Sequence, residues 1–338
     1  MNETSNISLF SIREENGELT KFSPETGTCF NKNIKGVISG FSKQFQDSFF
    51  YANVIQFLLV ALMYYKAGNG RYWKILLYAS IAGCVAGILE NFTVAVICRE
   101  GQEGKNGIVV PFLIDELFWT TQQYSVPLLN LTKMETIAWG PLAKYIKYFI
   151  VALLFPFIFF KFYIGYERMM SGYLVDEKIS SLHGFAFGTI AIADLVCSVS
   201  IIYFINKHKN SITQSKTSLS NQVKQSSYTI LLAVDMVEFF LSIFDIIANT
   251  GIAEDVVPAA VATPFQCLMS NFILILSTDA LLLKYNVNSR RTSVFQSSGI
   301  QNSAPINNNS FSRSAHAHQN SSHKNVNNPN QCAIDMPN

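Results

Sequence analysis

Residues 228–250 read YTILLAVDMVEFFLSIFDIIANT, an apolar stretch that polar residues interrupt at a regular spacing. The stretch exceeds the roughly 20 residues that an α-helix needs to cross a bilayer. Its polar residues fall at offsets of 0, 3, 7, 10 and 14, which places them on one face of a helix and excludes the alternation of a barrel strand. They are Asp235, Glu238, Ser242, Asp245 and Asn249. Because this face runs nearly the full thickness of a membrane, we expect it to line a cavity or to pack against other polar groups.

This stretch is one of seven apolar blocks that are each long enough to cross a bilayer. Of the 338 residues, 49% are hydrophobic and 14% are charged, whereas soluble domains are about one quarter charged. The composition argues against a soluble enzyme, and a net charge of +2 gives no reason to expect a nucleic-acid partner. We therefore predict an all-α polytopic membrane protein, a bundle of seven transmembrane helices. The predicted spans are 48–66, 73–97, 108–131, 142–163, 183–205, 228–250 and 257–283.

The basic residues predict the orientation of these spans. The fifth loop, residues 206–227, holds four lysines and no acid, whereas the loop before the last span holds no basic residue. The positive-inside rule then places residues 1–47 outside the cell and the tail, residues 284–338, in the cytoplasm. Omitting the span 108–131, whose middle reads DELFWTTQQYS, would turn the lysine-rich loop outward against the same rule. The Asn- and Ser-rich tail is expected to be disordered.

Several residues are candidates for covalent modification. Asn2 and Asn6 head acceptor triplets for N-glycosylation in the outer segment, and Ser293 follows two arginines in a pattern that basic-directed kinases recognise. Cys29 and Cys98 both fall on the oxidising side, where we predict that they form a disulfide; two free thiols are the alternative. The cysteines show no metal-ligand spacing, so no metal or other cofactor is predicted.

Acidic residues within the predicted spans are the most informative feature of the sequence. Ionisable groups are costly inside a bilayer, so each is a candidate for function. No Lys or Arg is expected well inside any span to pair with them. The alternative is that the acids are protonated and merely form hydrogen bonds between helices. These acids are Glu90, Asp115, Glu116, Asp194, Asp235, Glu238, Asp245 and Asp279.

The acids nearest the outer face predict a pocket. Glu90 lies seven residues before the end of the second span, and Asp115 lies seven residues after the start of the third, each roughly 10 Å deep. An acidic pocket of this kind, with Trp119 beside it, suits a cationic ligand through charge pairing and a cation–π contact. The predicted ligand-binding residues are Glu90, Asp115, Glu116, Trp119, Gln122, Gln123 and Asp245.

Further polar residues continue towards the inner face. A series of acids from one face to the other would serve to carry protons or Na⁺, which makes a cation-coupled transporter a second interpretation. The residues of this polar stripe or ion path are Asp194, Asp235, Glu238, Ser242, Asn249 and Asp279.

The layout of seven spans, a glycosylated outer segment, an outer pocket and a basic fifth loop resembles that of G-protein-coupled receptors. The resemblance covers residues 48–300 and lies in the topology alone. Residues 130–133 read Asn-Leu-Thr-Lys where the rhodopsin-like class has Asp-Arg-Tyr, and residues 277–280 read Ser-Thr-Asp-Ala in place of Asn-Pro-x-x-Tyr. The resemblance therefore implies a divergent receptor. Residues 257–283 contain no lysine, which excludes a retinal pigment.

The sequence thus leads to three interpretations, none of them an enzyme. The first is a plasma-membrane receptor that senses an extracellular ligand and signals through its cytoplasmic loops, with a heterotrimeric G protein and the surrounding lipid as its partners. The second is a proton- or cation-coupled transporter. The third is a membrane scaffold without a ligand, in which the polar stripe only holds helices together.

Overall fold

The computed structural model describes residues 19–299 except 33, 48–49, 69, 103–106, 137, 139, 212–217 and 250–262. Over these residues the chain is helical and contains no strand, only an isolated bridge between Ile34 and Arg99. The prediction of an all-α fold is therefore confirmed for this part of the chain. Its elements are the 3₁₀ helix η2 (Pro24–Thr26) and the α-helices α1 (Val37–Asp47), α2 (Phe50–Ala67), α3 (Arg71–Ile97), α4 (Val110–Glu135), α5 (Pro141–Ser171), α6 (Glu177–Ser211), α7 (Ser218–Asn249), α8 (Thr263–Met269) and α9 (Phe272–Gly299).

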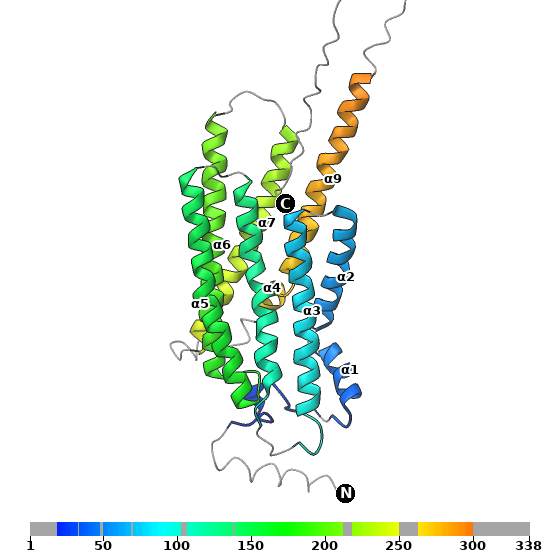
Figure 1. Ribbon diagram of the computed structural model, residues 1–338, viewed down its shortest axis with the longest axis vertical. Coiled ribbons are helices and arrows are strands. Elements are labelled where there is room, and N and C mark those ends of the chain that lie inside the picture. Colours follow the sequence, from blue (N-terminus) through cyan, green and yellow to red (C-terminus); the bar gives the residue numbers. More distant parts are fainter. Residues whose placement is uncertain are drawn as a thin grey trace, which may run out of the picture.

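The long helices lie side by side along one axis (Figure 1). Each of the helices α3 to α7 packs along the helix before it in the chain, and α9 packs against α2, α3 and α7. Helix α4 also contacts α6, so it lies in the interior of the bundle. We call the lower end in Figure 1, where α3 ends and α4 begins, the disulfide end, and the other the opposite end.

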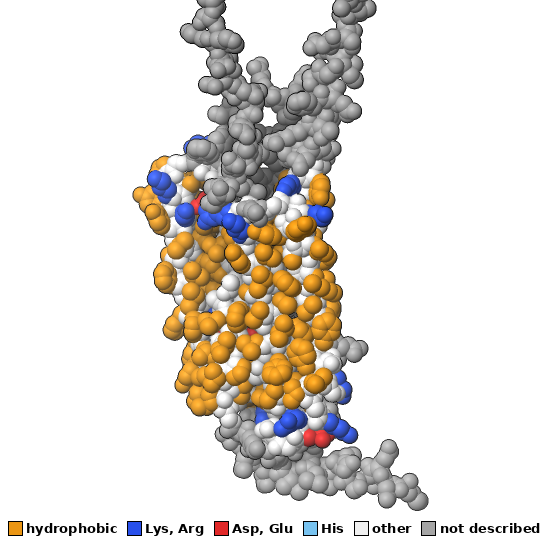
Figure 2. All heavy atoms as spheres, turned by 45° about the vertical axis from the view of Figure 1, so that its right-hand side comes forward, with side chains coloured by type: hydrophobic (Ala, Val, Ile, Leu, Met, Phe, Trp, Pro, Cys, Tyr) orange, Lys and Arg blue, Asp and Glu red, His pale blue; other side chains and the backbone are white. Residues whose placement is uncertain are grey.

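Apolar side chains cover the outside of this bundle, and several acidic side chains are buried inside it. Phe155 on α5 and Tyr78 on α3 are 72% and 64% exposed, whereas Asp115 and Asp194 are completely buried. Figure 2 shows the hydrophobic side chains as a broad belt, with Lys and Arg above and below it. A soluble protein does not expose a continuous belt of large apolar side chains, and it rarely buries acids completely. The arrangement indicates a protein that is embedded in a membrane.

Four of the described helices are long and apolar enough to cross a membrane by length and composition. They correspond to the predicted spans 48–66, 73–97, 142–163 and 183–205. Helices α4 and α7 occupy the places of two further predicted spans, but they carry many of the interior acids, which lower their hydropathy. The four helices are Phe50–Ala67, Arg71–Ile97, Pro141–Ser171 and Glu177–Ile205.

Several helix bounds differ from those predicted. Helix α5 continues to Ser171, eight residues past the predicted end at 163, and α6 begins six residues early, at Glu177. The predicted tail also begins as helix, since α9 runs to Gly299 with no Pro or Gly before that residue to interrupt it. Residues 300–338 lie outside the described residues.

The last predicted span, 257–283, is divided into α8 and α9 by a turn at Ser270 and Asn271. The side chains of these two residues donate to the carbonyls of Gln266 and Cys267, at 3.0 and 2.9 Å. Such bonds compete with the helical ladder, and they accompany a break that no Pro or Gly marks. The freed amide of Leu274, in the first turn of α9, donates instead to the side-chain oxygen of Gln56 on α2, at 3.1 Å.

Residues 19–47, which we call the N-terminal segment, lie across the disulfide end of the bundle (Figure 1). Cys29 forms a disulfide with Cys98, where α3 ends, with 5.2 Å between the two Cα atoms. The amide of Leu174, between α5 and α6, donates to Thr28 Oγ1 at 2.8 Å. Helix α1 packs against α3. The segment is thereby fastened both to α3 and to the α5–α6 connection.

The opposite half of the bundle is filled by a large apolar cluster. It includes Trp73 and Leu76 from α3, Met134 from α4 and Phe204 from α6, all of them buried. At its edge Lys133 Nζ on α4 lies 3.1 Å from Asp279 Oδ2 on α9. The described interior of this half is therefore packed mainly with apolar side chains.

The exposed belt yields a test of membrane embedding. Phe155 lies near the middle of α5, so Phe155→Arg would place a charge in the hydrocarbon at a cost of about 3 kcal/mol. We expect a marked fall in the fraction of protein that resists alkaline extraction from membranes. Phe155→Leu is the matched control and should behave as the parent. Equal extraction of both variants would contradict a lipid-facing position for Phe155.

The disulfide yields a second test. Cys29 and Cys98 are 69 residues apart, and a loop of that length is expected to contribute about 4 kcal/mol through the entropy of the unfolded chain. Cys29→Ser should lower the melting temperature of the detergent-solubilised protein, and dithiothreitol should lower that of the parent to the same value. Cys84→Ser, which removes a free thiol, is the control. Melting that does not respond to reduction would contradict the stabilising role.

Candidate functional site

The disulfide half of the bundle contains a cavity of about 630 Å³. This volume lies within the range of sites that bind small molecules. Helices α2 to α9 all contribute to its wall, and Gly27 and Lys32 of the N-terminal segment line it as well. Val126 and Phe272 line it on the side of the apolar cluster that fills the opposite half. The cavity therefore lies between the N-terminal segment and a closed interior.

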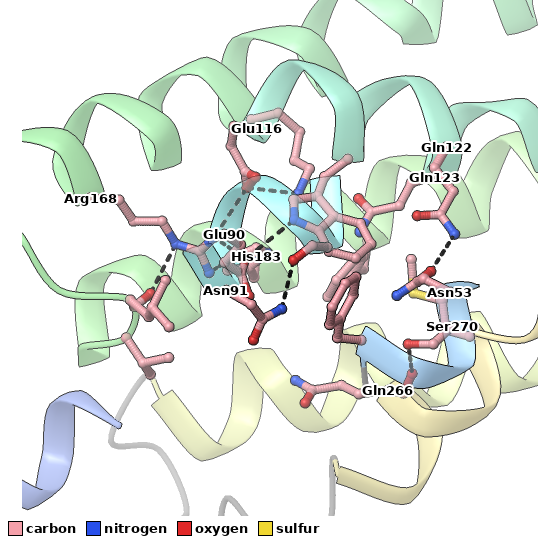
Figure 3. Close-up of a pocket in the computed structure, with 18 of the residues that line it drawn as sticks. Asn53, Glu90, Asn91, Glu116, Gln122, Gln123, Arg168, His183, Gln266 and Ser270 are labelled. Atoms are coloured by element: carbon pink, nitrogen blue, oxygen red, sulfur yellow. Dashed lines mark hydrogen bonds and ion pairs between the residues drawn. The ribbon is translucent and has the colours of Figure 1, made fainter. Parts of the chain in front are cut away.

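A buried ion pair joins two helices at the cavity wall. Lys161 Nζ on α5 lies 3.0 Å from Glu116 Oε1 on α4, and both side chains are at most 2% exposed. Arg168, two turns further along α5, places Nη1 3.8 Å from Glu116 Oε1 and from Glu90 Oε2 on α3. Trp119 Nε1 donates to the same Glu90 oxygen at 3.2 Å. Glu90, Glu116 and Arg168 lie together on one side of the cavity in Figure 3.

Arg168 is held by further contacts. Its Nε donates to the carbonyl oxygen of Leu174 at 2.9 Å, and its Nη2 lies 3.2 Å from His183 Nε2 on α6. The guanidinium thus joins α3, α4, α6 and the α5–α6 connection at one point. The planar fork of an arginine is suited to several simultaneous contacts of this kind.

This arrangement corrects the expectation that no basic residue lies inside a span. Lys161 is 1% exposed and pairs with an acid, and Arg168 lies within α5 because that helix continues to Ser171. The outer acids are therefore not an unpaired negative cluster. The spacing of seven residues between Lys161 and Arg168 places both on one helix face, and this was the signal in the sequence that could have revealed them.

Glycines allow the helices to approach closely around this site. A Cβ atom at Gly165 on α5 would lie 3.1 Å from the Cβ of Glu116, so any larger residue would push α5 away from α4. A Cβ at Gly83 on α3 would lie within 2.5 Å of the carboxamide of Gln122. The Gln122 amide uses this space to donate to Asn53 Oδ1 on α2 at 3.2 Å, a contact that Figure 3 shows.

A second group of acids lies at the border between the cavity and the closed half. Glu238 on α7 lines the cavity, and the carboxyls of Asp194 and Asp235 lie beside it. Asn130 Nδ2 on α4 donates to Asp194 at 2.7 Å, and the Ser198 hydroxyl donates to Asp235. Glu238 is 2% exposed; its carboxyl is hydrogen-bonded to that of Asp194, and its oxygens accept no hydrogen bond from any other kind of side chain. This group joins α4, α6 and α7 and contains no basic side chain within the described part of the chain.

Five of the seven predicted ligand-binding residues line the cavity, and Asp115 does not. Asp115 is buried beside Glu90, Glu116 and Arg168 without reaching the cavity. Asp245 belongs to α7, but its side chain lies outside the described residues. The residues that line the cavity are Glu90, Glu116, Trp119, Gln122 and Gln123.

The predicted polar stripe is only partly continuous. Ser242 donates to the carbonyl oxygen of Gly184 at 3.2 Å and so serves to pack α7 on α6. Asp279 pairs with Lys133, whose charge also reaches Asp235 of the acid group around Glu238. The side chains of Asn249 and Ser293 lie outside the described residues, as do Asn2 and Asn6.

Comparisons with known proteins supply no relative: the chain matches no protein family, no curated protein and no solved structure. Among the described residues, no group of three or more His, Cys, Asp or Glu side chains is placed to hold a metal ion. The chemistry of the cavity therefore has to be derived from its own residues.

The buried ion pair yields a third test. Lys161→Met would leave Glu116 without its closest counter-ion, which typically costs about 3–5 kcal/mol at a buried pair. The double variant Glu116→Gln, Lys161→Met removes both charges and should recover most of the lost thermal stability. Both are measured as melting temperatures in detergent. A double variant that is less stable than Lys161→Met alone would contradict a direct coupling between the two side chains.

Proposed function

We propose that this protein is a seven-transmembrane receptor of the plasma membrane that binds a small polar molecule in the cavity at its disulfide end. The observation that carries this proposal is the one-sided cavity. Charged and amide side chains line it in the disulfide half, whereas a buried apolar cluster fills the opposite half. A site of this kind admits a ligand from one side only, as a sensor requires. A transporter must instead open its site to the two sides of the membrane in turn.

The packing of the helices supports seven spans. Helix α4 packs along both α3 and α5, and α7 packs along α6. If α3, α5 and α6 cross the membrane, α4 and α7 cross it beside them, with their acids turned inward. Helix α9 contacts α2, α3 and α7 and would be the seventh span, with the short α8 completing it at the disulfide end. The acids that lower the hydropathy of α4 and α7 are compatible with this because they face protein.

The chemistry of the two ends supports the orientation. The Cys29–Cys98 disulfide needs an oxidising compartment, so its end would face outside. Exposed basic residues lie near the short connections at the other end. They include Lys66 and Arg71 on either side of the α2–α3 connection, and Lys144 and Lys147 after the α4–α5 connection. By the positive-inside rule that end would be cytoplasmic.

Helix α4 offers a connection between the cavity and the cytoplasmic end. It carries Glu116 and Gln122 at the cavity and Lys133 at the other end, where Lys133 pairs with Asp279 of α9. A ligand that favours one position of α4 would thereby bias the contact between α4 and α9. We propose that a heterotrimeric G protein binds at the cytoplasmic end, where α6 continues to Ser211, and responds to the altered contact between α4 and α9.

A specific observation favours a second candidate, a proton- or cation-coupled transporter. The acids around Glu238 border the cavity, and the chain breaks between α8 and α9 at the same level, where Ser270 and Phe272 line the cavity. Broken helices beside intramembrane acids are typical of ion-coupled transporters. The closed opposite half would then belong to one state of an alternating cycle.

The proposed function predicts that heterotrimeric G protein co-purifies with the full-length detergent-solubilised protein and that a non-hydrolysable GTP analogue releases it. Lys133→Met, which breaks the pair with Asp279, should change the amount bound by severalfold while the protein remains folded. Lys43→Met removes an exposed charge at the disulfide end and should have no effect.

Three outcomes distinguish the candidates. Association that the nucleotide releases supports the receptor. Absence of association, together with proton or Na⁺ flux in liposomes that Glu238→Gln abolishes, contradicts the receptor and supports the transporter. Absence of both G-protein association and ion flux contradicts the receptor and the transporter. The polar interior would then only hold the helices of a scaffold together.

A further inference from the structure

The hydrogen-bonding groups that remain unused at the cavity are almost all acceptors. Among the described buried side-chain atoms of the residues that line it, five oxygens accept no hydrogen bond from an N–H or hydroxyl group. The single nitrogen without a partner is His183 Nδ1, which carries the ring hydrogen because Nε2 accepts from Arg168. The five oxygens are Glu116 Oε2, Gln122 Oε1, Gln123 Oε1, Glu238 Oε1 and Glu238 Oε2. Since unpaired buried acceptors are unfavourable, a complementary ligand would bring donors.

The charges of the cavity are unevenly neutralised. Glu116 and Glu90 face Lys161 and Arg168, so the positive charges on that side already have carboxylate partners. Glu238 has no positively charged side chain paired with it within the described residues. The charged groups that face it are the carboxyls of Asp194 and Asp235, from α6 and α7. One positive charge placed at Glu238 would relieve this repulsion, whereas an anion would have to displace the existing pairs.

We propose that the ligand of this cavity carries a protonated amine, and that this group binds to Glu238. The inference rests on the proposed function in that the cavity must bind a ligand. An ammonium group has three donors and no acceptor, which suits a carboxyl whose oxygens accept from no N–H group and whose charged neighbours are two further carboxyls. The remaining lining includes Trp119, Phe187 and Phe272, so the rest of the ligand would include an apolar or aromatic part.

The residue proposed to bind the cation differs from the outer acids that the sequence predicted for this role. Glu90 accepts from Trp119 and faces Arg168, and Asp115 lies behind the wall. Glu238 reaches the cavity from α7, the helix whose polar face first indicated an interior position. The same carboxylate borders Asp194, which Asn130 of α4 contacts, so an amine at Glu238 would act on the packing of α4 against α6 and α7.

The test uses pairs of probes that differ in charge and little in shape. For the purified full-length protein, 2-phenylethylamine and n-butylamine should raise the melting temperature, while 2-phenylethanol and 1-butanol at the same concentrations should not. Glu238→Gln should weaken amine binding roughly 30-fold or more, the expected effect of removing one partner of a buried charge pair. Glu135→Gln, an acid at the opposite end that pairs with Arg71 and Lys147, is the matched control and should bind as the parent does.

Further measurements keep the proposal falsifiable. Glu238→Gln removes one of three crowded carboxyls and should fold; should it fail, Glu238→Asp keeps the charge and should retain the preference for amines over alcohols. Equal stabilisation by amines and alcohols would overturn the assignment. So would stabilisation by NaCl alone that depends on Glu238, because the site would then hold an inorganic cation. G-protein association that the nucleotide still releases would, in either case, leave the receptor proposal standing.

Discussion

The buried pair between Lys161 and Glu116 is the contact on which the disulfide half of this bundle depends. Neither charge is tolerable alone in a low-dielectric interior, so α5 and α4 must meet at one rotation and one height. Gly165 permits the approach, and Arg168 then extends the network to α3 and α6. The cavity wall is therefore a consequence of electrostatic pairing, because the lipid-facing apolar surface could not by itself fix the rotation of a helix.

The two halves of the bundle are held by different kinds of interaction. Around the cavity the helices meet through ion pairs, amide contacts and glycine-dependent close approach, and many acceptors there remain available. In the other half they meet through apolar packing around Trp73 and Leu76. Such a division allows small rearrangements at the polar half without disturbing the rest, because interior packing resists volume change whereas polar contacts have alternatives.

The sequence identified the helical class, the position of the spans and the interior face of residues 228–250 because these depend on local hydropathy and period. It also indicated most of the cavity residues on α4. It did not reveal the partners of the acids, since pairing depends on how each helix is rotated, and Lys161, near the end of the predicted span 142–163, was not expected well inside it. The break at Ser270 and Asn271 was missed for a similar reason. Side-chain bonds to the backbone accompany it, and no Pro or Gly marks it.

The link between Cys29 and Cys98 also constrains the order in which this protein is made. Its two sulfurs are separated by the whole of α2 and α3, so the bond cannot form before that first helical hairpin has been synthesised and inserted. In the proposed orientation, the early part of the chain reaches the oxidising compartment and stays unattached there until α3 is complete. From that point the bond is able to form, before most of the helices that form the cavity wall have been made.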